Sequence, residues 1–250
     1  MVNSKPYIID ETVDFAVVYK PHCMHSLPMH SIPLKRESEK EDSTLLDWFL
    51  QQSFNGRRHH ENAVNINLMH RLDFETQGLI LIAKNEDSYI FFKASQDRGE
   101  FIKEYSAVST NPAYMDLPGF PPPPVFDEHA PSLEDPLVIE SYFRPYGQGR
   151  KQVRPVIEDG KKHKEIARDK NGFYRTEIVD IDGNTFTVRI KRGFRHQIRC
   201  HLCWIGHPIQ NDPLYLMPDA SVQGSLALCA HSIYIPNPVG RKQLEYKINK

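Results

Sequence analysis

The clearest hydrophobic pattern in the chain is an uninterrupted apolar run, Leu79 to Ala83, directly after Gly78. A short run of this kind bounded by glycine is typical of a strand that is buried on both faces. The seven positions in front of it hold five side chains suited to chemistry: His70, Arg71, Asp73, Glu75 and Thr76. Because a buried strand is a rigid support, this density of polar groups at its start predicts a functional site.

The region before this strand predicts two short strands and one helix. Residues 7–20 are expected to form two strands around a turn at Asp10–Glu11. Ser43 is the expected N-cap of an amphipathic helix. The buried face of that helix contains Leu45, Trp48 and Phe49. Residues 51–67 are polar, and we expect no regular structure there.

The region after the buried strand predicts a helix, a strand and a hairpin. Asn85 is the expected cap of a helix that ends near Gly99, and residues 101–109 switch to a strand pattern. Residues 176–190 alternate between polar and apolar positions around Asp182–Gly183, which predicts a β-hairpin. The inward positions of its second strand are Phe186, Val188 and Ile190.

Residues 192–215 form a second dense polar stretch. The apolar positions at helical spacing predict one buried helix face: Ile198, Leu202 and Ile205. Gly206 is the expected residue at the end of this helix. Arg195 and Arg199 are expected to share another face of the helix.

The composition is that of an ordinary soluble globular protein, with 40% hydrophobic and 25% charged residues among 250. No apolar run approaches the roughly 18 residues of a membrane span, so we expect no membrane association. The first residues lack the apolar core of a signal peptide, which favours a cytoplasmic location. The length suits one domain over residues 1–250, most simply a monomer.

The cysteines and histidines do not predict a metal site. The four cysteines are scattered, as expected for reduced thiols in the cytoplasm. Cys200 and Cys203 lie inside the predicted C-terminal helix, where packing explains them. A further group lies on a Pro- and Ser-rich loop without recognised ligand spacing: His22, Cys23, His25 and His30.

Charge and proline are unevenly distributed. The formal net charge is −1, yet residues 144–199 hold 15 Lys or Arg against 7 Asp or Glu. A local excess of this size suits a groove that follows a phosphate backbone, although a solvated basic face is the simpler alternative. Residues 111–136 contain eight of the 19 prolines, which predicts a surface insertion in polyproline II conformation.

The two dense stretches, in this order, resemble the motifs of RluA-type pseudouridine synthases. His70-Arg71-Leu72-Asp73, Thr76, Gly78 and Ala83-Lys84 resemble the family's HRLD, T-S-G and AK signature, with Gln77 in place of Ser. Lys20-Pro21 resembles the opening KP segment, and Lys103-Glu104-Tyr105 resembles K-x-Y. Residues 193–215 resemble G-R-T-H-Q-I-R-x-H-L and G-H-P-I-x-G-D-x-x-Y. The departures there are Phe194, Arg195 and Asn211.

The resemblance implies an α/β (α+β) fold with a long mixed, mainly antiparallel sheet, flanking helices and a central active cleft. It implies an isomerase that converts uridine of rRNA or tRNA to pseudouridine without a cofactor, and no S4 RNA-binding module is visible in the sequence. Asp73 would be the nucleophile, Tyr105 the pocket aromatic and Arg199 the ion-pair partner of Asp73. The positions that would contact RNA or the flipped uridine are His70, Arg71, Thr76, Arg195, His196, Gln197 and Ile198.

Three further hypotheses stay open at this stage. With Phe194 and Arg195 in place of Arg-Thr, Arg195 is expected to take over a phosphate contact while Phe194 packs as a loop anchor. A catalytically silent RNA-binding relative would keep the basic groove without needing Asp73. A hydrolase that uses His70 and Asp73 as an acid–base pair fits the residue types, but no nucleophile motif supports it.

Overall fold

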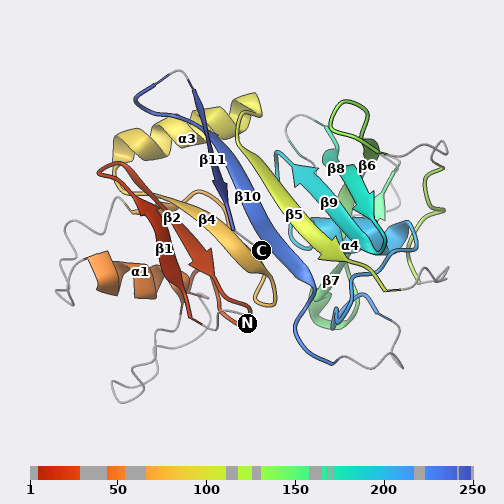
Figure 1. Ribbon diagram of the computed structural model, residues 1–250. Helices are drawn as coiled ribbons and strands as arrows, with labels where there is room; N and C mark the ends of the chain where they lie inside the picture. Colours follow the sequence, from red (N-terminus) through yellow and green to blue (C-terminus); the bar gives the residue numbers. More distant parts are fainter. Residues whose placement is uncertain are drawn as a thin grey trace, which may run out of the picture. The chain divides into compact units, whose positions relative to one another are not determined.

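The computed structural model describes residues 5–28, 44–53, 66–110, 118–125, 131–157, 165–167, 169, 172–216, 223–240 and 242–248. The chain divides into two compact units, residues 1–101 with 230–250 (unit 1) and residues 102–229 (unit 2). The α/β class and the mixed, mainly antiparallel sheet are confirmed (Figure 1). A single catalytic domain and a central active cleft stay predictions.

Unit 1 contains a sheet with two helices. Its strands follow the order β1-β2-β4-β10, with β3 beside β4 and β11 beside β10. Their bounds are β1 Tyr7–Glu11, β2 Phe15–Lys20, β3 Asn67–Leu68, β4 Gln77–Ala83, β10 Leu228–Pro236 and β11 Gln243–Lys247. The helices are α1 Leu45–Ser53 and α3 Glu86–Arg98. β4 is buried from Gly78 to Ala83, which confirms the predicted strand.

Local signals fixed most of the boundaries of unit 1. The side chain of Asn85 accepts the Ser88 amide, and Gly99 ends α3 in the left-handed region, as predicted. The first turn was predicted at Asp10–Glu11, but these residues belong to β1. The turn lies at 12–14 instead, because the Thr12 hydroxyl accepts the amides of Asp14 and Phe15.

Two other expectations for unit 1 need correction. Residues 51–53 continue α1 and 67–68 form β3, so the prediction of no regular structure over 51–67 is wrong at both ends; residues 54–65 lie outside the described residues. Ser43 lies outside the described residues, whereas the Thr44 hydroxyl accepts the amide of Asp47 at the start of α1. The predicted buried face of α1 is confirmed at Leu45 and Phe49.

Unit 2 contains a second set of strands in the order β5-β9-β8-β6-β7. Their bounds are β5 Ile102–Val108, β6 Leu137–Tyr146, β7 Gln152–Val156, β8 Tyr174–Asp182 and β9 Thr185–Ile190, with the short 3-10 helix η1 at Gln148–Arg150 and α4 at Gln197–Trp204. The β8–β9 hairpin and its buried Phe186, Val188 and Ile190 are confirmed. The β6–β7 hairpin was missed, because glycines and charges obscure its alternation.

Helix α4 is buried on every side, packed against β7 and β8. The expectation of one buried face with Arg195 and Arg199 on another is therefore wrong. Arg195 precedes the helix and is exposed, while Arg199 is 1% exposed. Gly206 follows the helix with φ +84°, as predicted. Packing of the two helix cysteines is confirmed, and burial raises the pKa of Cys203 to about 12.

The proline-rich segment is described at 118–125 and 131–136, and the rest of 111–136 lies outside the described residues. Side chains of unit 2 hold its first part by backbone carbonyls. Arg154 donates to Pro118 O, Arg144 to Gly119 O, and the Trp204 indole to Pro121 O. Residues 118–121 are therefore attached to the unit, and the surface insertion in polyproline II conformation stays a prediction.

Candidate active site

The loop that carries Asp73, residues 70–76, lies directly before β4. The ring of His70 accepts the amide of Leu81 at 3.3 Å, which ties the start of the loop to the strand. At its end the Thr76 amide donates to Asp73 O at 3.1 Å. Asp73 is half-buried and Arg71 is exposed. The strand therefore anchors the start of the loop through His70, and a hydrogen bond within the loop fixes the backbone between Asp73 and Thr76.

Both neighbours of Asp73 are bonded to the segment 20–26. The Ser26 hydroxyl donates to Leu72 O at 3.0 Å and accepts the Leu72 amide at 3.2 Å. On the other side, Lys20 Nζ donates to Phe74 O at 3.3 Å, and the His25 ring lies 4.7 Å from the Phe74 ring. Asp73 is thus held between two fixed residues, which limits the positions that its carboxylate can take.

Lys20 is a site residue that sequence reasoning missed. It is fully buried, and its ammonium also donates to Pro21 O and Met24 O, at 3.0 and 2.8 Å. Burial lowers the pKa of Lys20 to about 8, and the negative charge of Asp73 opposes that shift. The sequence did contain a signal for this role, because Lys20 ends an otherwise apolar strand. A lysine in a buried strand is uncommon unless its ammonium has polar partners.

Thr76 provides a polar group without an internal partner. Its side chain is 2% exposed, and its hydroxyl has no hydrogen-bond partner among the described residues. A buried hydroxyl in this state is costly unless a ligand or water completes it. This observation fits the predicted substrate-binding role of Thr76.

In unit 2, Tyr105 lies in the middle of β5 and is 5% exposed, opposite Val188 of β9. Charged side chains of the two residues before this tyrosine hold the strand in place. Lys103 Nζ donates to Lys191 O at 3.0 Å, and Arg189 pairs with Glu104 at 2.6 Å. The backbone of Tyr105 is therefore rigidly placed, whichever role its ring has.

Arg199 has a buried carboxylate partner inside unit 2. Its Nε and Nη2 each lie 2.8 Å from one oxygen of Asp212, and both side chains are at most 1% exposed. Asp212 Oδ1 also accepts the amides of Leu214 and Tyr215. Sequence reasoning placed Asp212 in the motif without giving it this role. Pairing of Arg199 with Asp73 stays a prediction.

The residues before and within α4 use their polar groups internally. Gln197 is 2% exposed. The NH2 group of its side chain donates to Arg175 O and to the Thr176 hydroxyl. The oxygen of its side chain accepts the backbone amide of Phe194. Ile198 is 5% exposed. His196 has left-handed backbone, with φ 57°. These contacts position the turn before α4, and they leave Gln197 and Ile198 little surface for direct contact with RNA.

The three departures from the family motif are Phe194, Arg195 and Asn211, and each has a different structural setting. The Phe194 ring is stacked on Phe143 with centroids 5.0 Å apart and an angle of 7°, so the predicted loop anchor is confirmed. Arg195 is exposed and donates to Arg150 O at 2.7 Å and Gln152 O at 3.3 Å. Asn211, the third departure, has φ 60°, the left-handed backbone that this replacement requires.

Many positive charges of unit 2 are paired. Arg150, Arg175 and Arg192 form ion pairs with carboxylates of the same unit, as Arg189 does. The excess of basic residues between 144 and 199 therefore overstates the charge available to a phosphate backbone. Lys151 and Arg195 are exposed cations for which no carboxylate partner is found in the described part of the chain.

The predicted site residues fall into two groups. Unit 1 brings together His70, Arg71, Asp73 and Thr76 on one loop. Unit 2 holds Tyr105 on β5 and the second group around the start of α4: Arg195, His196, Gln197, Ile198 and Arg199. Convergence of Asp73 with Tyr105 and Arg199 stays a prediction. Among the described helices, none has both the length and the apolar character needed to span a membrane.

Comparison with known proteins gives a match over most of the chain. The RNA pseudouridylate synthase family matches residues 14–204. An uncharacterised Caenorhabditis elegans protein is 30% identical over 211 residues, which cover 83% of this chain and 38% of that protein. The mitochondrial tRNA pseudouridine(32) synthase of Saccharomyces cerevisiae is 27% identical over 233 residues, covering 85% of this chain and 45% of the yeast protein. The chain thus spans less than half the length of each of these relatives.

A solved structure supports the fold. Human RNA pseudouridylate synthase domain containing 1 aligns with a TM-score of 0.63 at 19% identity, covering 98% of this chain and 84% of the human chain. The match to the family includes the Asp73 loop, β5 and the whole of α4. From these matches and from the two motifs in their expected order, we conclude that the chain belongs to the RNA pseudouridylate synthase family.

Proposed function

We propose that the chain is an RNA pseudouridine synthase with Asp73 as its nucleophile. The observation that carries the proposal is the fixation of Leu72 and Phe74 by Ser26 and Lys20, on either side of a half-buried carboxylate. A nucleophile must meet its target in a narrow range of positions, and this arrangement provides that restriction before substrate arrives. The ammonium of Lys20, which donates to the carbonyl of Phe74, adds a fixed positive charge near this loop.

The reaction is an isomerisation, so its atoms balance without a cofactor. The N1–C1′ bond of uridine breaks, the uracil rotates, and a C5–C1′ bond forms; C5 loses a proton and N1 gains one. The uridine must first leave its stack, at a cost of a few kcal/mol. Tyr105 would offset this cost by stacking, and Arg71 by filling the space left by the base. The remaining contacts would come from His70, Thr76 and Arg195.

Two roles change from those that the motif alone implied. Because Gln197 and Ile198 are buried and the Gln197 side chain is hydrogen-bonded internally, we assign both residues to positioning the turn before α4 instead of contacting RNA. Arg199 would orient the Asp73 carboxylate while Asp212 orients Arg199. The substrate class is rRNA or tRNA, and we propose a monomeric single-domain enzyme of the cytoplasm.

The test is the tritium-release assay on RNA that contains [5-³H]uridine. Wild-type protein should release tritium, and Asp73→Asn should abolish release while leaving the unfolding midpoint and RNA affinity nearly unchanged. Asp182→Asn, an exposed acid in the β8–β9 turn, is the matched control and should keep full activity. Retained release in Asp73→Asn would sink the mechanism. Binding without release in the wild-type protein, with every RNA tried, would favour a silent RNA-binding relative.

A further inference from the structure

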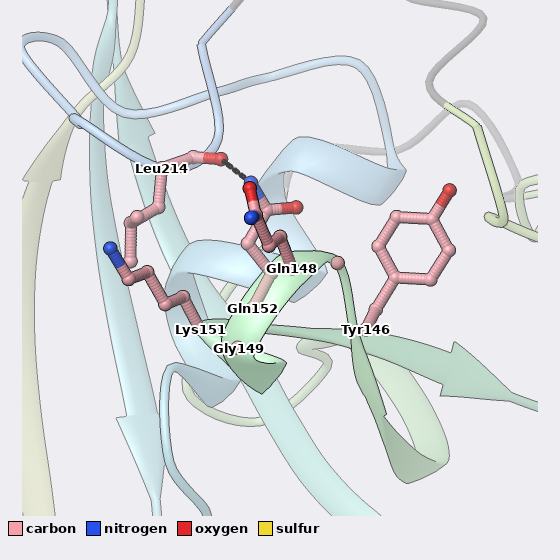
Figure 2. A pocket seen from close by; sticks show the side chains of 7 residues that line it. Tyr146, Gln148, Gly149, Lys151, Gln152 and Leu214 are labelled. Carbon is pink, nitrogen blue, oxygen red and sulfur yellow. Dashed lines mark hydrogen bonds between the residues drawn. The ribbon is translucent and has the colours of Figure 1, made fainter.

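A pocket that the proposed chemistry does not use lies at the tip of the β6–β7 hairpin. It has a volume of about 550 Å³ and lies around the turn between the two strands (Figure 2). Its lining is Tyr146, Gly147, Gln148, Gly149, Lys151, Gln152 and Leu214. A volume in this range accommodates a ligand of the size of a nucleotide.

The lining combines the groups that recognise a nucleotide. Tyr146 and Leu214 supply apolar surface, Gln148 and Gln152 supply amides, and Lys151 supplies an ammonium. In Figure 2, Lys151 and Leu214 lie on one side of the turn and the Tyr146 ring on the other. The Gln152 amide donates to Leu214 O at 2.7 Å and so fixes one wall. Within the described structure, the side chains of Gln148 and Lys151 have no hydrogen-bond partner.

The backbone of the turn keeps the pocket open. Gly147, Gly149 and Arg150 all have positive φ, at 77°, 66° and 56°. A Cβ added at Gly147 would meet nothing within 4 Å. Arg150 is not a glycine, so its left-handed backbone is an uncommon conformation that the surroundings must maintain. Arg195 contributes to this, because it donates to the Arg150 carbonyl at 2.7 Å.

Two further arginines fix the Tyr146 wall of the pocket. The guanidinium of Arg154 lies 4.1 Å from the centre of the Tyr146 ring, and that of Arg144 lies 5.2 Å from it. Arg154 is 4% exposed, and it donates to Pro118 O and Val153 O. The ring is therefore held in one place before any ligand binds.

The charge around the pocket favours an anion. Arg150 is paired with Glu165, at 2.7 Å, which removes one positive charge from the tip. Lys151 and Arg195 have no carboxylate partner in the described structure, and both are exposed. Arg195 joins the turn before α4 to the tip of the β6–β7 hairpin. A single strand of RNA that contacts Arg195 would therefore have its neighbouring nucleotide at the pocket.

We propose that this pocket binds one nucleotide of the RNA substrate, outside the uridine that is isomerised. The base packs against Tyr146 and Leu214, the amides of Gln148 and Gln152 meet its edge, and Lys151 and Arg195 contact the phosphates. The proposal rests on the proposed function for the identity of the RNA as substrate, but the binding that it describes is measurable without turnover.

The test uses the chain of 250 residues and unmodified tRNA transcripts. The variants are Lys151→Ala and Gln148→Ala, with Lys93→Ala on the exposed side of α3 as the matched control, because Lys93 does not line the pocket. Affinity is measured by fluorescence anisotropy at several salt concentrations. Lys151→Ala should reduce the slope of log affinity against log salt by about one. Gln148→Ala should weaken binding about threefold with the slope unchanged, and Lys93→Ala should change neither.

Photocrosslinking provides the second readout. Transcripts that contain 4-thiouridine should crosslink to the peptide that spans residues 146–152, as identified by mass spectrometry, and the crosslink should fall in Lys151→Ala. A slope change in Lys151→Ala with no effect of Gln148→Ala and no crosslink would indicate surface charge alone, and would overturn the pocket. Unchanged RNA affinity in both variants would also overturn the pocket proposal.

The tritium-release assay separates failure of this inference from failure of the proposed function. If wild-type protein releases tritium but Lys151→Ala and Gln148→Ala bind RNA normally, the pocket proposal is wrong and the function stands. If wild-type protein releases none while both variants weaken binding and the crosslink is found, the pocket stands and the catalytic function is wrong.

Discussion

Arg199 and Asp212 form a buried ion pair in which two guanidinium nitrogens each lie 2.8 Å from a separate carboxylate oxygen. Asp212 follows α4 and Arg199 lies within it, so the pair fastens the helix to the segment 212–215. A fully satisfied buried pair specifies a geometry more than it adds stability, because removing two charges from water is costly. Removal of one partner, in contrast, leaves the other charge buried without compensation and lowers the stability of the fold.

Asp212→Asn should destabilise the protein by about 3–5 kcal/mol, because it leaves the Arg199 guanidinium buried without a counter-charge. The measurement is urea unfolding followed by circular dichroism. Asp182→Asn, an exposed acid in the same unit, should change the free energy of unfolding by no more than about 0.5 kcal/mol. Equal stability of Asp212→Asn and wild type would mean that another group balances Arg199.

Tyr105→Phe should keep RNA affinity and lose turnover. The ring remains for stacking, whereas the hydroxyl that would handle the C5 proton is gone. Single-turnover tritium release at saturating RNA separates the two effects, and Tyr105→Leu, which removes the ring, should weaken binding as well. Normal turnover in Tyr105→Phe would restrict this residue to stacking.

Arg195→Gln should reduce the slope of log RNA affinity against log salt by about one. Glutamine keeps a donor for the carbonyls of Arg150 and Gln152 but removes the charge. Single-turnover chemistry at saturating RNA should therefore change little. If chemistry collapses while the salt slope stays the same, Arg195 belongs to the catalytic machinery and not to phosphate binding.

Lys20 should make stability depend on pH in the alkaline range. Burial lowers its pKa from 10.5 to about 8 in the folded protein. Between these values the unfolded chain holds more protons than the folded one, so the free energy of unfolding should rise with pH; below about pH 8 both states are protonated and the contribution is constant. The rise should reach roughly 2 kcal/mol by about pH 10.

The control for Lys20 is Lys20→Met, which keeps an apolar stem of similar length and removes the titrating group. Urea unfolding of both proteins at about pH 7 and pH 10 gives the comparison. Between these two pH values the free energy of unfolding should rise by roughly 2 kcal/mol more in the wild type than in Lys20→Met. Identical pH dependence in the two proteins would show that Lys20 titrates normally.

Gly78→Ala should prevent stable folding of unit 1. A Cβ at this position would lie 2.3 Å from Ala230 O and 2.5 Å from Ala230 N, and the backbone has φ +130°. Gly183→Ala is the comparison, because Gly183 also has positive φ but has open space around it. That variant should lose about 1 kcal/mol and stay folded. A folded Gly78→Ala protein with normal unfolding midpoint would contradict the close approach.

Local chemistry made several features predictable from the sequence. The cap at Asn85, the left-handed Gly99 and the β8–β9 hairpin each depend on residues adjacent in the chain. The anchor role of Phe194 followed from a departure within a motif, and its stacking on Phe143 agrees with it. The cap and the hairpin have their causes within a short stretch of sequence, whereas the stacking partner of Phe194 comes from β6.

The features that were missed depend on residues far apart in the sequence. Nothing near Lys20 indicates that its ammonium meets the carbonyl of Phe74, 54 positions away. Gln197 looked like a surface residue of a motif, but its partners come from β8. The β6–β7 hairpin contains a charged turn that periodicity alone does not reveal. Tertiary contacts, and not propensity, decide these positions.

The hydrogen bond between the Leu72 amide and the Ser26 hydroxyl makes that amide a reporter of the loop that carries Asp73. That amide exchanges its hydrogen with solvent only when the loop separates from the segment 20–26, because its partner is a side chain and not a strand neighbour. Its exchange rate therefore measures how often the loop that carries Asp73 leaves its fixed position. Slower exchange of this single amide in the presence of RNA would mean that substrate tightens the loop, and an unchanged rate would mean that the position was complete beforehand.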